Sequence, residues 1–597
     1  MKLSDYVLNF LIRNKVTHIF NLAGGSIAHL LDSMYQNTKI KSVVVRHEQA
    51  GAFAAEGYSR ITGNIGVAMA TSGPGATNMI TGIASAFFDS VPMLYLTGQV
   101  NTYEYKFNNR MRQRGFQETD IVSMIKPITK FACRVVHPIQ IRYILEKAVF
   151  LAKSQRPGPV LIDLPMDIQR ADVKEGQLIT FYGSKEHKLY CKRFPSRVSS
   201  EEQAKIRLFL KKARIARRPL ILAGGGLRAS GSVGLFDKFS SLLRFPVVCS
   251  LMGLDVMDHS DPRYCGMIGS YGNRYANITV ANCDLLLVLG SRLDTRQTGT
   301  RPATFAREAD IFHVDIDPAE LAYRKFHCYH PVLCDLPVFF QQCIHELERV
   351  NDHNIRGKEW MKAIQRFKEG YSREKYPPMP VDIQELFDFL SEQSSVPVAY
   401  TLDVGQHQMW ASQSLRLKKQ DRLITCGGLG SMGFGLPAAI GAFLAKPRAR
   451  QIMIAGDGGF QMNLQELETV KHYHIPLKMI VVNNHCLGMV REFQEIYFKK
   501  RYQSTVKGYS CVSFQRTALA YQIPYVSFRN TADFKRRIRG VLGKKGPVII
   551  EVNLPQKTSV FPKLLVDRPV EDQNPPVSRM KLLKDMFVKP MIRESIS

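Results

Sequence analysis

The sequence predicts an α/β protein made of three doubly wound domains, each built around a parallel sheet. Three observations support this fold class. Short apolar runs recur along the chain, and segments with helical spacing of apolar residues separate them. Several of these runs end directly in glycine turns, as strands of open α/β sheets often do. The pattern occurs in three blocks, which gives the expected number of domains.

Breaks in composition between the blocks give the expected domain boundaries. Polar, charged stretches without strand or helix periodicity separate the blocks, and a basic stretch follows the last one. We therefore expect an N-terminal domain at 1–175, a linker at 176–205, a central domain at 206–350, a connector at 351–380, a C-terminal domain at 381–555 and a basic tail at 556–597.

The composition is that of an ordinary globular protein. Of the 597 residues, 45% are hydrophobic and 22% are charged. No apolar run reaches the roughly 18 residues that cross a bilayer, and the amphipathic N-terminus has neither a signal-peptide core nor a transit-peptide composition. The eleven cysteines form no CxxC pair, which is typical of reduced thiols. We therefore expect a cytoplasmic protein with no membrane role.

The formal net charge of +29 raises the question of a nucleic-acid partner. The basic residues are spread along the chain, and no basic motif interleaved with aromatic residues accompanies them. A solvated basic surface explains this distribution better than a binding patch. We expect no nucleic-acid partner; salt-sensitive DNA binding would contradict this expectation.

The stretch from Ile452 to Val490 predicts a strand–helix–strand unit. One apolar run ends in Gly456-Asp457-Gly458, and a second leads into Asn483-Asn484. The two strands of such a unit are parallel, so both loops lie at the sheet edge where open α/β sheets bind ligands. A carboxylate and an amide oxygen suit Mg²⁺ that is shared with a bound phosphate. A lone Gly-Asp-Gly is usually a plain turn, but this pair predicts a magnesium–diphosphate site.

These two loops resemble the signature of the thiamine-diphosphate enzymes. The resemblance implies that the metal ligands are Asp457, Asn484 and the main-chain carbonyl of Cys486. It also implies that Met432, in GSMGFG, lies under the cofactor and bends it. The other residues that it implies for cofactor binding in this part of the chain are Gly456, Gly458, Gly459 and Cys486, with Gln406 and His407 of GQHQMW at the diphosphate.

The N-terminal segments RHEQAGAFAAEGYSR, TSGPGATN and PMLYLTGQV resemble the pyrimidine-binding domain of the same family. Taken alone, Glu48 could simply complement a helix dipole, an effect worth under about 1 kcal/mol. The resemblance implies instead that Glu48 is catalytic and contacts the aminopyrimidine of the cofactor. It also places Gly25 near the cofactor, and Phe116 and Gln117 of GFQETDIV beside the reacting carbon. A capped loop without a catalytic role is the alternative for Gln117.

The central block contains four apolar strands, several of which end in glycine turns. Its triple glycine is weak evidence for a nucleotide on its own, because it does not match GxGxxG. The domain carries FAD in some relatives, and a purely structural sheet is the alternative. The residues implied as FAD neighbours are Gly225, Arg228, Gly269, Arg292, Arg296 and Asp315.

Within the thiamine-diphosphate enzymes, residues 1 to 555 most resemble the catalytic large subunits of the acetolactate (acetohydroxyacid) synthase family. The resemblance implies a transferase of branched-chain amino-acid biosynthesis. It would decarboxylate pyruvate and transfer the two-carbon unit to a second 2-keto acid, either pyruvate or 2-oxobutyrate. It also implies an obligate homodimer or dimer of dimers with Glu48 and the metal on different subunits, and allows a regulatory subunit.

Four positions depart from the family pattern at the substrate and flavin side. Met166 occupies a position where the family usually has lysine, Ile268 one with histidine, Thr295 one with aspartate and Phe493 one with tryptophan. Met166 and Phe493 are expected to line the substrate pocket. These departures leave open another thiamine-diphosphate-dependent decarboxylase, lyase or carboligase with a different keto acid. A non-catalytic basic binding protein on the same fold is the alternative of another class.

Overall fold

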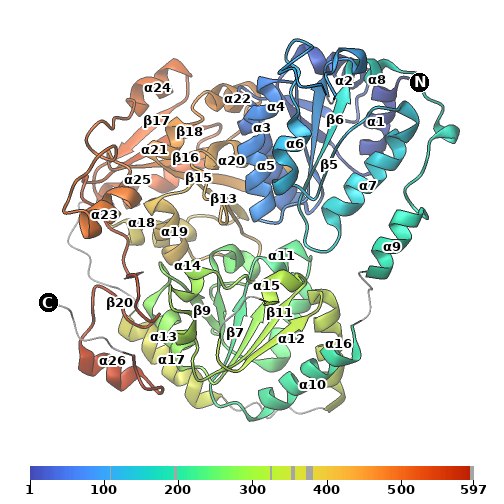
Figure 1. Ribbon diagram of the computed structural model, residues 1–597. Helices are drawn as coiled ribbons and strands as arrows, with labels where there is room; N and C mark the ends of the chain where they lie inside the picture. The colour runs from blue at the N-terminus through green and yellow to red at the C-terminus, as the bar shows by residue number, and fades with distance from the viewer. Residues whose placement is uncertain (108, 194–197, 323–325, 351–356, 372–380, 592–597) are drawn as a thin grey trace.

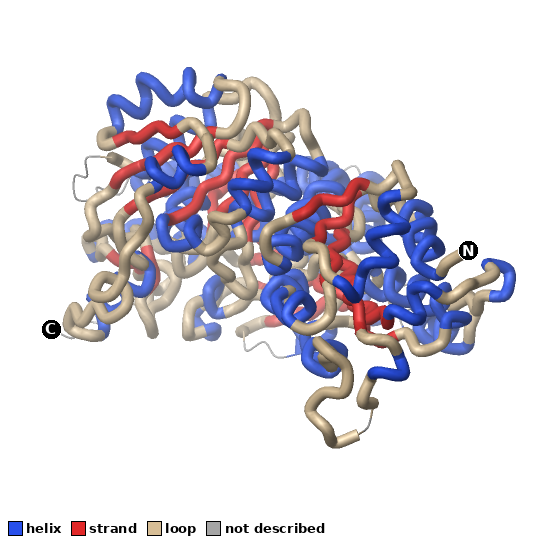
Figure 2. The backbone as a smooth tube through the Cα atoms, turned by 90° about the horizontal axis from the view of Figure 1, so that it is seen from above, coloured by secondary structure: helices blue, strands red, loops and turns tan. Residues whose placement is uncertain are grey.

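The computed structural model describes residues 1–597 except 108, 194–197, 323–325, 351–356, 372–380 and 592–597. Parts of the expected linker, connector and tail therefore lie outside the described residues. The chain forms three lobes, each with its own six-stranded parallel sheet (Figure 1). Helices lie on both sides of the sheets, as the view from above shows (Figure 2). The predicted fold class is confirmed.

The N-terminal sheet has the strand order β2-β1-β3-β4-β6-β5. Apolar residues alternate between its faces, so that one face packs against α1 (Leu3–Arg13) and α7 (Ile141–Lys153) and the other against α3 (Glu48–Thr62) and α5 (Ile80–Phe88). The strands are β1 (His18–Asn21), β2 (Lys41–Val44), β3 (Gly66–Ala70), β4 (Met93–Gln99), β5 (Phe131–Arg134) and β6 (Pro159–Pro165).

The C-terminal sheet has the equivalent order β14-β13-β15-β16-β18-β17. Gly456 at the end of β15 pairs with Val482 near the end of β16, so the two predicted ligand loops leave the sheet side by side. The strands are β13 (Val398–Leu402), β14 (Arg422–Thr425), β15 (Arg450–Gly456), β16 (Lys478–Asn483), β17 (Tyr525–Phe528) and β18 (Val548–Asn553).

The central sheet, of order β12-β11-β10-β7-β8-β9, has two strands more than the four that the sequence predicts. The unpredicted strands, β9 and β12, are at its two edges, where an apolar run is not needed because one side of the strand is unpaired. The strands are β7 (Pro219–Ala223), β8 (Val247–Cys249), β9 (Tyr264–Met267), β10 (Leu285–Leu289), β11 (Asp310–Asp315) and β12 (Tyr329–Leu333).

Two segments outside the three predicted domains pack on the central lobe. Helix α17 (Lys358–Tyr371) lies within the expected connector, and helix α26 (Arg579–Asp585) lies within the expected tail. Both bury side chains in one apolar cluster with the central sheet, and the hydroxyl of Tyr371 donates to Asp585 at 2.8 Å. The tail thus runs from the C-terminal lobe to the central lobe (Figure 1).

Helix α3 of the N-terminal lobe packs directly on α20 (Gly435–Ala445) of the C-terminal lobe. The approach is close because both helices present glycine. A Cβ built on Gly57 would lie 2.2 Å from the carbonyl oxygen of Ala438, and one built on Gly441 would lie 1.8 Å from that of Ala54. Numbers rise along one helix as they fall along the other, so the helices are antiparallel.

This contact predicts the effect of a single methyl group. Gly441→Ala should lower the free energy of unfolding by about 1–3 kcal/mol, because the added Cβ overpacks a backbone-to-backbone contact. The matched control is Gly540→Ala in helix α25 (Thr531–Gly543), where no atom lies within 4 Å of the added Cβ. The control should be neutral or slightly stabilising. Denaturant unfolding of both variants measures the difference, and equal midpoints would contradict the packing.

Candidate active site

Three segments of the C-terminal lobe, two loops and the short helix α21 (Asp457–Gln461), meet at the carboxyl edge of its sheet. They follow β14, β15 and β16, and contain Met432, Gly458 and Leu487 respectively. A Cβ built on Gly458 would lie 2.6 Å from Cδ2 of Leu487 and 3.2 Å from Cε of Met432. The three segments are therefore in contact at the residue that follows the predicted ligand Asp457.

The side chains of Asp457 and Asn484 lie at the ends of neighbouring strands, as the strand pairing requires. Asp457 is buried, and burial raises its pKa to about 6. The hydroxyl of Tyr509 donates to its Oδ2 at 2.9 Å. No ion pair of the described residues neutralises this carboxylate. A buried carboxylate without a cation partner fits a bound divalent ion.

The amide of Asn484 has a defined orientation. Its Nδ2 donates to Oε1 of Gln406 at 3.2 Å and to Oγ1 of Thr558 at 2.9 Å. The oxygen Oδ1 accepts none of the hydrogen bonds among the described residues, so the amide keeps its acceptor for another group. Gln406 and His407 open helix α19 (Gln406–Ser414) at the end of β13.

His407 is buried, and burial lowers its pKa to about 4. Its Nε2 has no hydrogen-bond partner within the described part of the chain, although the ring lies against the Gly-Asp-Gly loop, with Nδ1 3.0 Å from a Cβ built on Gly456. Buried polar atoms are normally paired. This orphaned nitrogen, the unneutralised Asp457 and the oriented Asn484 together fit Mg²⁺ and a diphosphate.

Asp403 holds two of the loops in place, and sequence reasoning missed it. It is fully buried at the end of β13, where it accepts hydrogen bonds from the amides of Gly433 at 3.1 Å and Gly435 at 2.9 Å. Burial raises its pKa to about 6. A Cβ on Gly459 would lie 2.4 Å from its Oδ1. One carboxylate thus packs the Met432 turn against the Gly-Asp-Gly loop.

The predicted N-terminal residues gather at the carboxyl edge of the first sheet. Glu48 opens α3, and the side-chain amide of Asn78 donates to its Oε2 at 2.9 Å. A Cβ on Gly75 would lie 3.3 Å from the other carboxylate oxygen. Gln117 lies against the same glycine turn, with its Cβ 3.0 Å from one built on Gly73. A Cβ built on Gly25 would meet no atom within 4 Å.

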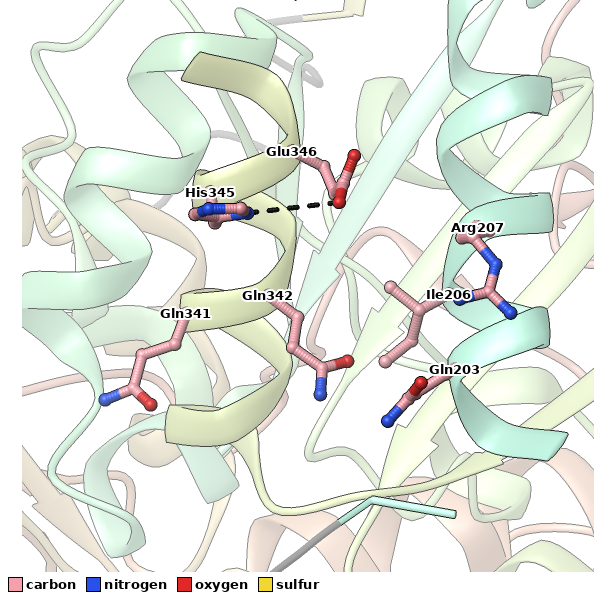
Figure 3. Close-up of a pocket in the computed structure, with 7 residues that line it drawn as sticks. All are labelled: Gln203, Ile206, Arg207, Gln341, Gln342, His345 and Glu346. Atoms are coloured by element: carbon pink, nitrogen blue, oxygen red, sulfur yellow. Dashed lines mark ion pairs between the residues drawn. The ribbon is translucent and has the colours of Figure 1, made fainter. Parts of the chain in front are cut away.

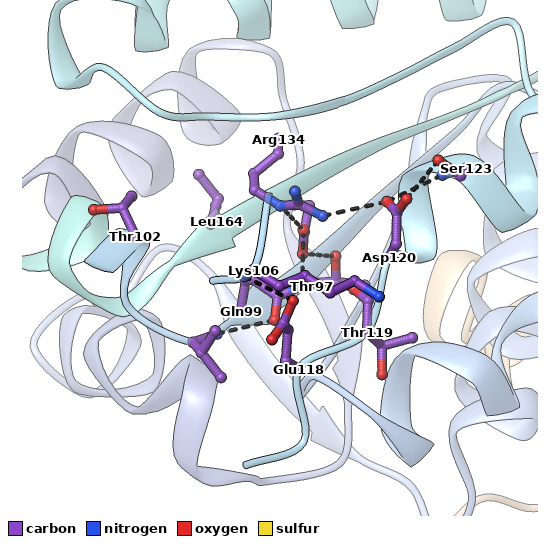
Figure 4. A network of polar contacts seen from close by, with 12 residues as sticks. Thr97, Gln99, Thr102, Lys106, Glu118, Thr119, Asp120, Ser123, Arg134 and Leu164 are labelled. Carbon is purple, nitrogen blue, oxygen red and sulfur yellow. Dashed lines mark hydrogen bonds and ion pairs between the residues drawn. The ribbon is translucent and has the colours of Figure 1, made fainter. Parts of the chain in front are cut away.

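A buried polar network ties the loop that carries Gln117 to the sheet (Figure 4). Glu118 accepts hydrogen bonds from three main-chain amides of this loop, those of Lys106, Arg114 and Gly115. Farther along, the side chain of Gln99 donates to the carbonyl of Thr119 at 2.7 Å. These bonds explain how Gln117 keeps its left-handed backbone, with φ of 61°.

Asp163, on β6, joins this strand to β4 and β5. Its carboxylate accepts from Thr97 at 2.8 Å, from Gln99 at 3.1 Å and from Nε of Arg134 at 2.9 Å. Arg134 also stacks on Tyr105, with Cζ 3.5 Å from the ring centroid. Burial raises the pKa of Asp163 to about 6. Asp163, Thr97 and Gln99 are buried, so we assign the network to support of the loop.

Within one chain, the two halves of the predicted site are far apart. Glu48 is at the beginning of α3, and Met432 precedes the beginning of α20. Because these helices are antiparallel, their beginnings lie at opposite ends of the pair, about 18 Å apart along the helix axes at 1.5 Å per residue. A cofactor that rests on Met432 cannot also contact Glu48 of the same chain.

The predicted flavin residues share the carboxyl edge of the central sheet. Asp315 ends β11, and burial raises its pKa to about 6. The others lie in the loops and short helices that follow strands β7, β9 and β10: Gly225, Arg228, Gly269, Arg292 and Arg296.

Arg228 is already engaged within the protein. Its Nε pairs with Oδ1 of Asp255 at 3.1 Å, and Arg422 of the C-terminal lobe pairs with the other oxygen at 2.7 Å. Arg292 is half-buried and pairs with Asp294 at 3.4 Å, and Arg296 is exposed, with its Cζ 5.9 Å from the ring centroid of Tyr271. The edge therefore offers two cations and one buried carboxylate, a donor set that fits an anionic dinucleotide.

The predicted substrate residues are distributed over both halves. Met166 follows β6 and is half-buried. Phe493 lies on α23 (Gly488–Tyr497), half-exposed, with its ring centroid 4.6 Å from that of Tyr497. Phe116 is 86% exposed although it neighbours Gln117. Large exposed apolar side chains next to a site indicate a surface that another molecule covers.

One hollow on the surface lies away from the predicted site residues. It has a volume of about 390 Å³ and is open between α10 (Ser200–Ile215) and α16 (Leu336–Val350) of the central lobe (Figure 3). Glutamines, Arg207, His345 and Glu346 line it, and the last two are on the same helix. None of the predicted site residues is among its lining, so it is not the site.

Comparison with known proteins agrees with this geometry. Three thiamine pyrophosphate enzyme domains match the chain: the N-terminal TPP-binding domain at residues 1–124, the central domain at 207–342 and the C-terminal TPP-binding domain at 403–552. The acetolactate synthase large subunit of Cyanidium caldarium is 35% identical over 570 residues, 94% of each chain. The chain belongs to the acetolactate synthase large-subunit family.

Other members of the family are equally similar. The large subunit of Lactococcus lactis is 36% identical over 563 residues, 94% of each chain. The isozyme 2 large subunit of Escherichia coli is 35% identical over 560 residues, 94% of this chain and 96% of the relative. The expected family is therefore confirmed, and the chain is a thiamine-diphosphate-dependent enzyme.

Several residues of this acetolactate synthase-like site escaped sequence reasoning. Asp403 had a signal, because it follows an apolar strand as Asp457 does. Tyr509 and Thr558 had none, since they lie in irregular segments far along the chain from the residues that they contact.

None of the described helices combines the length and apolar character needed to span a bilayer.

Proposed function

We propose that the protein is an acetolactate synthase that decarboxylates pyruvate and transfers the two-carbon unit to pyruvate or 2-oxobutyrate. The observation that carries the proposal is the meeting of Asp457, Asn484, His407 and Met432 at one sheet edge. A Mg²⁺ ion would be held by Asp457, Asn484 and the carbonyl of Cys486, and the diphosphate by Gln406, His407 and the glycines 456, 458 and 459.

When bound, thiamine diphosphate supplies the electron sink that delocalises the charge left by decarboxylation, which no side chain can do. The residues of the chain position and shield it. Met432 supports the cofactor from below, and Asp403 fixes the turn that carries Met432. His407 stays neutral near pH 7, because burial lowers its pKa to about 4, so it can donate one hydrogen bond to a phosphate oxygen.

A second copy of the chain would supply Glu48. Its carboxylate is oriented by Asn78 and would hold the proton shared with the aminopyrimidine of the cofactor. The separation of Glu48 from Met432 within one chain supports this arrangement. So do exposed apolar side chains on both halves, Phe116 on one and Phe493 with Val490 on the other. We therefore propose an obligate homodimer, or a dimer of dimers, with two sites between subunits.

The substrate pocket would be lined by residues of both subunits. Gln117 would place its amide beside the reacting carbon, and Phe116 and Met166 would line the pocket from the N-terminal half. Phe493 would line it from the C-terminal half. These apolar groups would exclude water from the reacting carbon, so that the second keto acid rather than a proton is the acceptor.

The proposal also covers FAD binding, the cellular compartment and a regulatory subunit. The edge with Arg292, Arg296 and Asp315 would bind FAD through its phosphates and a ribose hydroxyl, while Arg228 helps to hold the lobes together. All eleven cysteines are unpaired, which supports a reducing compartment such as the cytoplasm. Because the relatives are named as large subunits, a regulatory subunit is also part of the proposal.

Product analysis tests the activity. Purified protein with pyruvate, thiamine diphosphate and Mg²⁺ should form acetolactate, and chelation of Mg²⁺ should stop the reaction. Glu48→Gln should reduce kcat by at least about 100-fold, because it removes the group that shares the cofactor proton. The variant should keep the circular dichroism spectrum and the cofactor affinity of the unmodified protein.

Two outcomes would contradict the proposal. Formation of acetaldehyde without acetolactate would favour a decarboxylase that uses the same cofactor. Full activity of Glu48→Gln would exclude the assigned role of this carboxylate.

Absorbance tests the flavin site. The purified protein should show the visible absorption bands of oxidised flavin, and Asp315→Ala should weaken FAD binding by roughly 10-fold or more, as the loss of one hydrogen-bonding carboxylate would. Asp310→Ala is the matched control, because Asp310 begins the same strand and faces Lys212 at the opposite edge of the sheet. Equal FAD affinity of the two variants would contradict the assignment.

A further inference from the structure

The C-terminal tail enters the cofactor site. The tail leaves β18 at the carboxyl edge of the sheet. Thr558 is buried there, with 2% of its surface exposed. Its hydroxyl donates to Oε1 of Gln406 at 2.7 Å and accepts from Nδ2 of Asn484 at 2.9 Å. One tail residue therefore joins a proposed metal ligand to a proposed diphosphate ligand.

These contacts determine which end of the Asn484 amide faces the metal. An asparagine can bind a cation only through its oxygen, and the two ends of the amide have nearly the same shape. Oε1 of Gln406 and Oγ1 of Thr558 both take hydrogen bonds from Nδ2. With the nitrogen committed in this way, Oδ1 remains for a ligand. Partners of this kind tune metal affinity although they do not touch the metal.

A buried ion pair holds the tail in this position. Lys563 pairs with Glu492 of α23, and both side chains are less than a tenth exposed. Glu492 also accepts hydrogen bonds from Gln406 at 3.3 Å and from the amide of Val560 at 3.4 Å. Arg491 donates to the carbonyl of Thr558. The tail segment 558–563 is therefore attached to the helix that follows the Asn484 loop.

We propose that Thr558 is a positioning residue for Mg²⁺, and that the Glu492–Lys563 pair fastens the tail that carries it. The tail is then part of the cofactor site, and the site is complete only when residues 558–563 are docked. This inference rests on the proposed Mg²⁺–diphosphate site and adds the tail to it.

The test measures binding of thiamine diphosphate by the full-length protein as a function of Mg²⁺ concentration, by equilibrium dialysis. Thr558→Val removes the hydroxyl and should raise the Mg²⁺ concentration at half-saturation by about 10- to 100-fold. Thr558→Ser keeps the hydroxyl and should behave as the unmodified protein does. Ser559→Ala is the matched control, because it removes the neighbouring hydroxyl, which makes none of these contacts.

The double variant Glu492→Gln with Lys563→Met tests the fastening without leaving an unpaired buried charge. It should fold and should also need more Mg²⁺. An unchanged Mg²⁺ requirement of Thr558→Val or of the double variant would overturn the inference, provided that the unmodified protein binds. Failure of the unmodified protein to bind at any Mg²⁺ concentration would overturn the proposed function itself.

Discussion

The antiparallel contact between α3 and α20 is the constraint on which the account depends. It joins the N-terminal and C-terminal lobes through glycines whose backbones meet the carbonyls of Ala54 and Ala438. The contact also determines the chemistry, because it places Glu48 and Met432 at opposite ends of a helix pair. In the proposed site, the metal ligands and the acid of a single chain would therefore not act on the same cofactor. The proposed homodimer follows from this separation.

Burial of polar groups is the second constraint. Asp457, His407 and Asp403 are all buried at one sheet edge, and burial shifts the pKa of each towards its neutral form. Asp403 is compensated by main-chain amides, so its role is internal. Among the described residues, Asp457 has no ion-pair partner and Nε2 of His407 has no hydrogen-bond partner. Buried polar groups that lack partners next to a fully bonded one are candidates for ligand binding.

Much of the fold could be predicted from the sequence, because each interior strand is a short apolar run that ends in a turn. The strands β9 and β12 could not, since edge strands need fewer apolar residues. The helix α17 was not expected either, because many of its residues are polar or charged and the apolar face that includes Trp360, Ala363 and Phe367 is narrow. Local pattern identifies an element only when its environment requires that pattern.

The proposed site residues could be singled out in the sequence because each lies next to a strand end or inside a short motif. Contacts between distant segments had no such signal. Thr558 lies 74 positions from Asn484 in the sequence, and Lys563 lies 71 from Glu492. Only the folded chain brings these pairs together, so their roles depend on tertiary structure.

Complementation between two inactive variants tests the central claim most directly. Glu48→Gln loses the acid end, and Asp457→Asn loses the metal end, so each variant alone should be inactive. If a site takes Glu48 from one copy and Asp457 from the other, half of the sites in each mixed dimer are intact. Random mixing through refolding should then restore about a quarter of the unmodified activity. Absence of any recovery, with mixed dimers demonstrated, would contradict a site shared between two chains.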